Sequence, residues 1–364
     1  MVPWSRWSPW RLPVWEENAM IQFQCDYTEG CHPSILAALQ KTNLEQTPGY
    51  GTDPYCQQAR EAILALCQQP QAQVHFLVGG TQANATVIAS ILKAHQGVIS
   101  SEMGHIATHE TGSIEATGHK VLTLPAPDGR LSAQQVDDYC RAHYESPTFE
   151  HMVQPGMVYI SWPSECGTLY SKAQLEALRK VCDAWHMPLF LDGARLGYGL
   201  ASPQCDVTLA DIARLCDVFY IGGTKCGALF GEAVVITNPG LQKDFRYMIK
   251  QHGGMLAKGR LLGLQFLTLM TDGLYFSICK KAVEQAMALR AAFQARGIPM
   301  WGDSYVNLQF PILTQAQLDA LTERGYLYEI WEPTDDGRFI ARFCTSWATT
   351  EENLQRLIQD IGRL

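Results

Sequence analysis

Short apolar runs alternate with amphipathic helical patterns through the first two thirds of the chain. The runs lie between Val74 and Ile236 and read VHFLV, GVIS, KVLTL, MVYISW, PLFLD, VFYIG and AVVI. Runs of this length are typical of buried strands, and their regular separation by helical segments is typical of a parallel sheet covered by helices. The sequence therefore predicts an α/β domain of three layers with a mainly parallel sheet.

Start signals and glycines place several of the helices. Ser171 with Gln174 predicts a capping box ahead of the PLFLD run, and Asp53 before a proline predicts a helix start ahead of the first run. A long helical stretch then covers Leu256–Ala295. Its glycines, where breaks are expected, are Gly259, Gly263 and Gly273.

The segments predicted along the chain differ in composition and periodicity. Residues 1–20 hold four of the nine tryptophans and are predicted to be a disordered extension; a Trp-rich arm that docks on a partner is the alternative. Residues 21–253 form the large α/β domain, 254–297 the linking helices and 298–364 a small C-terminal α+β domain. The final helix of that domain is predicted to begin at a capping box of Thr349 and Glu352.

Charge and cysteine usage exclude several classes of protein. With 36 acidic against 28 basic residues, the net charge of -8 argues against a broad basic surface for nucleic acid. No N-terminal apolar run is long enough for a signal peptide or a membrane span. The twelve cysteines are scattered without a CxxC pair, which favours reduced thiols. We therefore expect a cytoplasmic protein that binds neither nucleic acid nor a membrane.

The first apolar run ends in a glycine-rich turn. In parallel α/β sheets, ligands lie beyond the carboxyl ends of the strands. Gly79 and Gly80 follow the first run, and Thr81 and Gln82 would open a helix whose free N–H groups suit a phosphate. A plain strand-to-helix turn has the same pattern, so this signal alone leaves both interpretations open.

A carboxylate and an amine follow two later runs. Asp192 ends PLFLD, and Lys225 follows VFYI in GGTKCG. Pyridoxal phosphate enzymes use such a pair: the lysine forms a Schiff base with the cofactor aldehyde, and the carboxylate keeps the pyridine nitrogen protonated. A helix cap and a solvated loop lysine are the ordinary alternatives for each residue alone, but together with the phosphate-type turn the pair favours the cofactor.

Histidines gather after the GVIS run. His105, His109, Glu110 and His119 lie close together in sequence, but there is no HExxH motif, no cysteine partner and no evident third ligand. We therefore predict no metal site. An imidazole at this strand end can instead cover an aromatic ring, whereas His109 and His119 can equally be helix-capping histidines on the surface.

Several longer motifs make the chain resemble a known family. It resembles the threonine aldolase and β-eliminating lyase family, which are pyridoxal phosphate enzymes of the fold-type I aspartate aminotransferase class. The matching segments run from Phe23 to the C-terminus and read FQCDYTEGCHPSILAAL, GYGTDPYC, GGTQAN, GHIATHETGSIEATGHKV, DGARLG, GGTKCG and RFCTSWATT. The resemblance implies a homodimer or homotetramer with shared sites and a small amino-acid substrate.

The resemblance also implies roles for single residues. Lys225 would bind the cofactor aldehyde and Asp192 its ring nitrogen, with His105 stacked on the ring. Arg195 would touch both cofactor and substrate, and Arg342 would join it at the substrate carboxylate. The remaining implied contacts are Cys25, near that carboxylate, and Gly80, Thr81 and Gln82 at the phosphate. Asp26 is expected to be structural.

Two departures from the family pattern bear on the reaction. Glu165 stands where many threonine aldolases have a histidine near the substrate hydroxyl, and Leu256 stands where an arginine follows GGM. The missing positive charge could come from Lys250, Lys258 or Arg260, across a subunit interface.

The expected reaction is cleavage of threonine or allo-threonine to glycine and an aldehyde. Candidates for the base that accepts the hydroxyl proton are Glu165, His105 and His109. β-Elimination, aminotransfer and racemisation use the same cofactor and stay open, as does a non-catalytic binding protein of the same fold. A nicotinamide enzyme is disfavoured, since no GxGxxG follows an early run.

Overall fold

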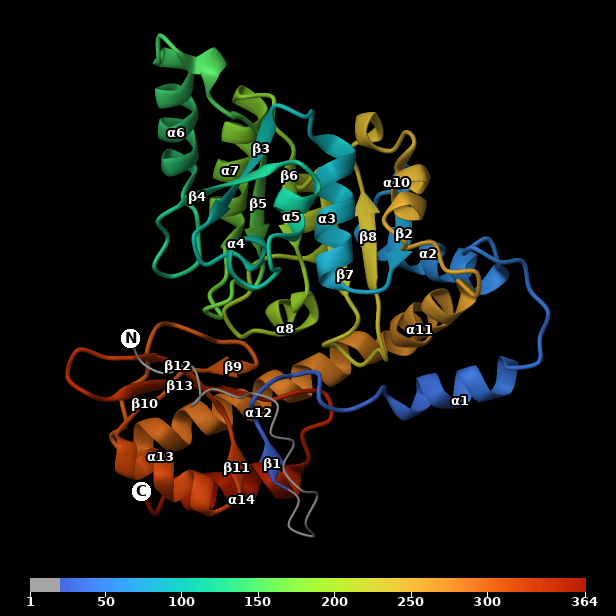
Figure 1. Ribbon diagram of the computed structural model, residues 1–364. Coiled ribbons are helices and arrows are strands. Elements are labelled where there is room, and N and C mark those ends of the chain that lie inside the picture. The colour runs from blue at the N-terminus through green and yellow to red at the C-terminus, as the bar shows by residue number, and fades with distance from the viewer. Residues whose placement is uncertain (1–19) are drawn as a thin grey trace.

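The computed structural model in Figure 1 describes residues 20–364 of the chain. The predicted extension, residues 1–20, lies outside the described residues except for Met20.

A seven-stranded sheet forms the centre of the large domain (Figure 1). Its strands are β2 (Gln73–Leu77), β3 (Gln96–Ser101), β4 (Lys120–Leu124), β5 (Gln154–Ser161), β6 (Leu189–Asp192), β7 (Val218–Gly222) and β8 (Glu232–Ile236). The spatial order is β2-β8-β7-β6-β5-β3-β4, and only β8 runs antiparallel to its neighbours. Each predicted apolar run forms one of these strands, so the mainly parallel sheet is confirmed.

Helices cover both faces of this sheet. The helices of this part of the chain are α2 (Pro54–Cys67), α3 (Gly80–Ile91), α4 (His105–Thr108), α5 (Ser113–Ala116), α6 (Ala133–Glu145), α7 (Lys172–Ala184), α8 (Leu196–Leu200), α9 (Leu209–Leu215) and α10 (Phe245–Gln251), whereas α1 (Pro33–Thr42) lies away from the sheet (Figure 1). Successive strand residues point to opposite faces. Leu189 and Leu191 accordingly pack in one apolar cluster with α2, α7 and α9, whereas Phe190 packs in another with α3 and α10. These clusters are the two cores of the predicted three-layer arrangement.

The predicted start signals of α2 and α7 are confirmed. Asp53 accepts a hydrogen bond from the Cys56 backbone N–H at 2.9 Å, and Ser171 and Gln174 form the reciprocal capping box. These caps satisfy N–H groups that a helix leaves unpaired at its first turn.

The long helical stretch is broken once. It forms α11 (Arg260–Met270) and α12 (Leu274–Ala295), which are separated at Thr271–Gly273, where Asp272 adopts a positive φ of 51°. Gly263 lies inside α11 and serves packing instead: a Cβ there would lie 2.5 Å from the Cys56 Cα on α2. The stretch is apolar and long enough to cross a membrane by composition alone, but the two helices pack against α2 and α8.

The small domain combines C-terminal and N-terminal segments (Figure 1). Strands β10 (Ile312–Leu313), β12 (Glu329–Pro333) and β9 (Leu308–Gln309) pair with β13 (Phe339–Cys344), and α13 (Gln315–Glu323) and α14 (Glu351–Ile361) complete the unit. Strand β1 (Ile21–Gln22) pairs in parallel with β11 (Tyr326–Leu327), and Phe23 enters the same core. The first described residues therefore pack with the small domain, which differs from the predicted start of the large domain at residue 21.

The start of α14 also differs from the prediction by one residue. Thr350 is the N-cap and accepts from the Asn353 backbone N–H, whereas the Thr349 hydroxyl accepts from the Ser346 backbone N–H at 2.8 Å. Thr349 is thus engaged in the preceding turn and cannot cap the helix.

Candidate active site

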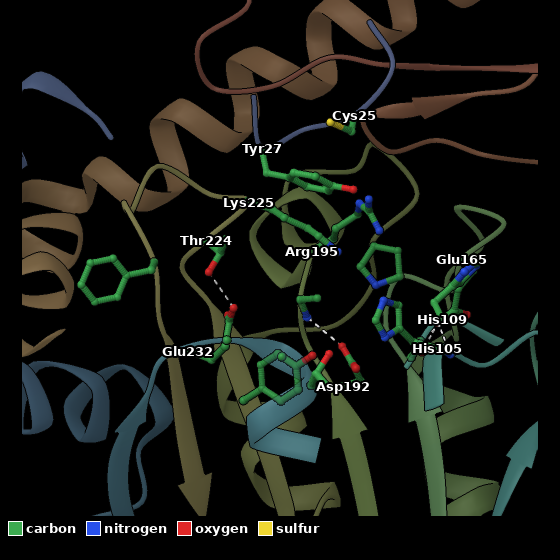
Figure 2. A pocket seen from close by; sticks show the side chains of 18 of the residues that line it. Cys25, Tyr27, His105, His109, Glu165, Asp192, Arg195, Thr224, Lys225 and Glu232 are labelled. Atoms are coloured by element: carbon green, nitrogen blue, oxygen red, sulfur yellow. Dashed lines mark hydrogen bonds between the residues drawn. The ribbon is translucent and has the colours of Figure 1, made fainter. Parts of the chain in front are cut away.

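A cavity of about 610 Å³ lies between the carboxyl ends of the sheet strands and the small domain. Figure 2 shows side chains from both sides of this cavity facing a common space. The predicted site residues that line it are Cys25, Gly80, Thr81, His105, His109, Glu165, Asp192, Arg195, Lys225 and Arg342. Segments up to about 300 residues apart in sequence therefore meet at one site, as expected for the open edge of a parallel sheet.

Lys225 lies in the turn that follows β7, and its amine faces the cavity (Figure 2). Burial lowers the pKa of this amine, and the neighbouring Arg195 lowers it further, although Asp26 and Asp192 act in the opposite direction. The Tyr198 hydroxyl donates to the Lys225 carbonyl at 2.6 Å and fixes the turn. A lysine with a lowered pKa has a larger neutral fraction, and the neutral amine is the form that attacks an aldehyde.

Asp192, the last residue of β6, is buried within a set of donors. It accepts hydrogen bonds from Asn84 at 3.0 Å, from the Tyr159 hydroxyl at 2.6 Å and from the backbone N–H of Ala194 at 3.0 Å. Burial alone would raise the pKa of this carboxyl, but His105 and the surrounding hydrogen bonds hold it below its ordinary value. Asp192 is therefore a buried carboxylate that stays charged.

The glycine turn after β2 opens directly into α3. No side chain caps this helix start, so its first N–H groups remain available to a ligand. A Cβ on Gly80 would lie 3.2 Å from the Tyr220 hydroxyl, so a side chain there would crowd the turn. Gln82 behaves differently from the other predicted phosphate contacts: its side chain accepts from Val78 N–H and donates to the His252 carbonyl, which braces the turn from outside the cavity.

Arg195 is held by Asp26 and makes no ion pair with Asp192. Its Nε lies 2.6 Å from Asp26 Oδ2, and its Nη2 lies 3.0 Å from Oδ1. Burial opposes the charge on Asp26, but Arg195 and Lys225 lower the pKa of this carboxyl to about 2. Because a bidentate carboxylate fixes the planar guanidinium, Asp26 orients the remaining donors of Arg195 at the cavity.

Arg342, on β13, reaches the cavity from the small domain. It forms an ion pair with Glu329, its partner in the register of β12 and β13, and its guanidinium lies 5.3 Å from the ring centroid of Trp331. Cys25 lines the same part of the cavity. Arg195 and Arg342 thus approach one space from opposite domains.

His105, His109 and Glu165 line another wall. His105 Nδ1 lies 2.8 Å from Glu110 Oε1, and its backbone N–H donates to Glu165 Oε1 at 2.9 Å. Burial raises the pKa of Glu165, partly offset by the hydrogen bond from Ser161. Partial burial lowers the pKa of His109, as do His105 and Arg342. Within residues 20–364, no group of three or more His, Cys, Asp or Glu residues is arranged to hold a metal ion.

Sequence reasoning missed several residues of the cavity. Glu232, Glu329 and Trp331 line it. The sequence pointed to Glu232, because an acid at the start of an apolar strand needs a polar partner, whereas Glu329 and Trp331 are brought to the cavity by the small domain. Asp26, expected to be structural, supports the cavity by holding Arg195. The lysines and the arginine predicted to replace the missing charge do not line the cavity of this chain.

Comparisons with known proteins identify the family of this chain. A family model described as beta-eliminating lyase matches residues 22–316. The chain belongs to the beta-eliminating lyase family. A low specificity L-threonine aldolase from a Pseudomonas species is 29% identical over 343 residues, which are 93% of this chain and 96% of that protein.

Solved structures extend the comparison to the fold. A threonine aldolase of Leishmania major is 45% identical, with a TM-score of 0.91 over 94% of this chain and 99% of that one. A Thermus thermophilus aspartate aminotransferase mutant is 15% identical, with a TM-score of 0.69 over 95% of this chain and 92% of that one. The predicted fold of the aspartate aminotransferase type is thereby confirmed for this lyase.

The cavity fits the cofactor on which enzymes of this family depend, pyridoxal 5'-phosphate. The donor set comprises an amine of lowered pKa on Lys225, a charged carboxylate on Asp192 and an uncapped helix start at Gly80. These three groups match the aldehyde, the ring nitrogen and the phosphate of the cofactor. The backbone after Asp192 also has no room for a side chain at Gly193, because a Cβ there would lie 1.9 Å from the Tyr220 carbonyl oxygen.

Proposed function

We propose that this chain is a pyridoxal phosphate-dependent aldolase that cleaves β-hydroxy-α-amino acids, threonine or allo-threonine, to glycine and an aldehyde. The observation that carries the proposal is the meeting of Lys225, Asp192 and two arginines in one cavity. Relatives named threonine aldolases match nearly the whole chain, which supports this substrate class.

Three groups would hold the cofactor. Lys225 would bind its aldehyde, Asp192 its ring nitrogen and the N–H groups at the start of α3 its phosphate, while His105 would cover the ring. When bound, the cofactor withdraws the electrons of a bond to the amino-acid Cα. Asp192 would support that withdrawal, because its buried charge would keep the ring nitrogen protonated.

The two arginines would orient the substrate. Arg195, fixed by Asp26, and Arg342, stacked on Trp331, would hold the α-carboxylate from two sides. Anchoring the carboxylate in this way decides which bond to Cα stands perpendicular to the cofactor ring, so it selects the bond that breaks. Aldol cleavage requires that this bond be the one between Cα and Cβ.

Among the three candidate bases, we propose that His109 accepts the proton of the substrate hydroxyl. Glu165 is the weaker candidate because its side chain is buried and its Oε1 already accepts two hydrogen bonds, from the His105 backbone N–H and the Ser161 hydroxyl. The Nδ1 of His105 is engaged by Glu110. His109 lines the cavity and has a lowered pKa, so near neutral pH its imidazole is neutral and can accept a proton.

A His109→Asn variant is expected to lower kcat by about a hundredfold, because general bases contribute about 100- to 10000-fold. In the wild type, kcat/KM falls below the lowered pKa of His109, where the imidazole becomes protonated. The variant should lose this acid limb. Steady-state kinetics across pH tests this, with the exposed His95→Asn as the matched control. An unchanged acid limb in the His109 variant would exclude it as the base.

The proposed reaction is tested by its products. The purified protein with added pyridoxal phosphate should release acetaldehyde and glycine from threonine or allo-threonine, measured with an aldehyde-coupled assay and by amino-acid chromatography. β-Elimination is the second candidate, because the family description names it. If serine yields pyruvate and threonine yields no aldehyde, the reaction is β-elimination and the proposal of aldol cleavage is wrong.

We further infer a homodimer or homotetramer located in the cytoplasm. Neither α10 nor the segment that follows it brings a cation to the glycine turn after β2 in the same chain. Lys250, on α10, lies over the Tyr50 ring, and Arg260 donates to the Thr42 and Asn43 carbonyls. A second copy could supply that charge. The twelve cysteines are free, in keeping with a reducing compartment. Light scattering of the purified protein tests the assembly.

A further inference from the structure

Glu232 lies between the two segments that would hold the cofactor. It is the first residue of β8, the antiparallel strand inserted between β2 and β7. In the register of the sheet it pairs with Leu77 on one side and Gly222 on the other. Leu77 leads directly into the phosphate turn, and Gly222 leads into the turn that carries Lys225. The Glu232 side chain therefore reaches the cavity where these turns meet (Figure 2).

The Glu232 carboxyl ties the lysine turn to the sheet. Its Oε1 accepts from the Thr224 hydroxyl at 2.8 Å, and its Oε2 accepts from the Gly223 backbone N–H at 3.0 Å. The Thr224 hydroxyl in turn accepts from the Gly231 N–H at 3.0 Å. The side chain is 3% exposed. Glu232 thus fixes the residue directly before Lys225 while lining the cavity beside the strand that leads into the glycine turn.

The charges around Glu232 make an ionised carboxyl costly at this place. Lys225 favours its ionised form, whereas Asp192 on β6 opposes it, and the Tyr220 hydroxyl from β7 faces the same side. Burial is the largest effect and raises the pKa of Glu232 to about 8, although the hydrogen bonds from Thr224 and Gly223 act against the rise. A phosphate dianion bound beside this group would disfavour its ionised form further.

We propose that Glu232 is a cofactor-positioning residue that must carry a proton while the phosphate group is bound. In this state it still holds the Thr224 turn but presents no negative charge to the phosphate. When Glu232 is ionised in the free protein, phosphate binding takes up one proton from solvent. This inference rests on the proposed function, because it concerns the same cofactor.

The sign of the pH dependence follows from this proton uptake. Below the pKa of about 8, Glu232 is already neutral and cofactor binding is at full strength. Above it, each pH unit should weaken the binding of a phosphate-bearing ligand by up to about tenfold. A glutamine at this position stays neutral, accepts from Gly223 N–H and donates to the Thr224 hydroxyl, so it should remove this dependence.

The experiment compares cofactor dissociation constants of the wild type and Glu232→Gln. Cofactor-free proteins are titrated with pyridoxal phosphate, and separately with pyridoxal, by tryptophan fluorescence between about pH 6.5 and about pH 9.5, on either side of the pKa. For pyridoxal phosphate, the two proteins should agree near pH 6.5, and the wild type should bind about tenfold more weakly near pH 9.5. For pyridoxal, which lacks the phosphate, the ratio of the two proteins' dissociation constants should not change with pH.

A Thr224→Ala variant gives a second, independent reading. Loss of the hydroxyl donor raises the pKa of Glu232, so the weakening of pyridoxal phosphate binding should begin at a higher pH than in the wild type. The inference would be overturned, and the proposed function left intact, if the ratio of the wild-type and Glu232→Gln dissociation constants for pyridoxal phosphate did not depend on pH. The same holds if this ratio changed equally for pyridoxal. A wild type that binds neither ligand near neutral pH would overturn both.

Discussion

Replacing Lys225 with alanine is expected to lower kcat by at least about a thousandfold, because the amine has no substitute within the cavity of this chain. The other basic side chains that line the cavity carry guanidinium or imidazole groups, and Arg195 is held by Asp26. The variant should also lose covalent attachment of the cofactor, measured as the adduct mass after borohydride reduction. Loss of both readouts together would assign Lys225 to the cofactor aldehyde.

The matched control for this prediction is Lys280→Ala. Lys280 lies on α12 with its side chain 70% exposed and does not line the cavity. Its variant should keep both the turnover and the reduced adduct of the wild type. A Lys225→Ala protein that retains a borohydride-trapped adduct at wild-type yield would contradict the assignment and place the attachment on another lysine.

Replacing Asp192 with asparagine is expected to lower kcat by about a hundredfold or more, with a smaller change in KM. In the proposed site the buried charge of Asp192 would keep the cofactor ring nitrogen protonated, and a neutral amide could not do so. Because the two arginines are proposed to bind the substrate carboxylate and are unchanged in this variant, the loss should fall on the chemical step. Steady-state kinetics with threonine and the pH dependence of the cofactor absorbance measure the effect.

Asp137→Asn provides a control for the loss of one carboxylate. Asp137 lies on α6, pairs with Arg141 and is outside the cavity. Its variant should keep the wild-type kcat. If Asp192→Asn retained wild-type kcat and cofactor absorbance, the ring nitrogen would need a different partner.

Local sequence signals predicted the large domain well. Most of the seven strands are buried on both faces and must therefore be apolar along their length, and all seven contain a short apolar run that is visible in the sequence. Caps such as Ser171 and Asp53 act within one helical turn, which also makes them readable. The start of α14 was misplaced by one residue because two adjacent threonines both carry a capping hydroxyl, and only their backbone surroundings separate them.

The residues at the ends of the strands were predicted because a parallel sheet brings its carboxyl ends to one edge. Asp192, Lys225 and the turn at Gly80 could thus be expected at one site without any coordinates. The resemblance to a family added Arg195, Arg342 and Cys25. All of them line the observed cavity, whereas the Gln82 side chain is used to brace the turn.

The sequence by itself determined the succession of strands and helices along the chain and the residue types at the strand ends, because both depend on periodicity and on local chemistry. Only the tertiary structure decided the partners: Asp26 beside Arg195, Glu329 beside Arg342 and Glu232 beside Thr224. The Asp26 and Arg195 pair joins residues 169 positions apart. Such pairs depend on how the two domains pack on either side of the cavity. No local sequence pattern indicates that two residues so far apart in the chain lie next to each other.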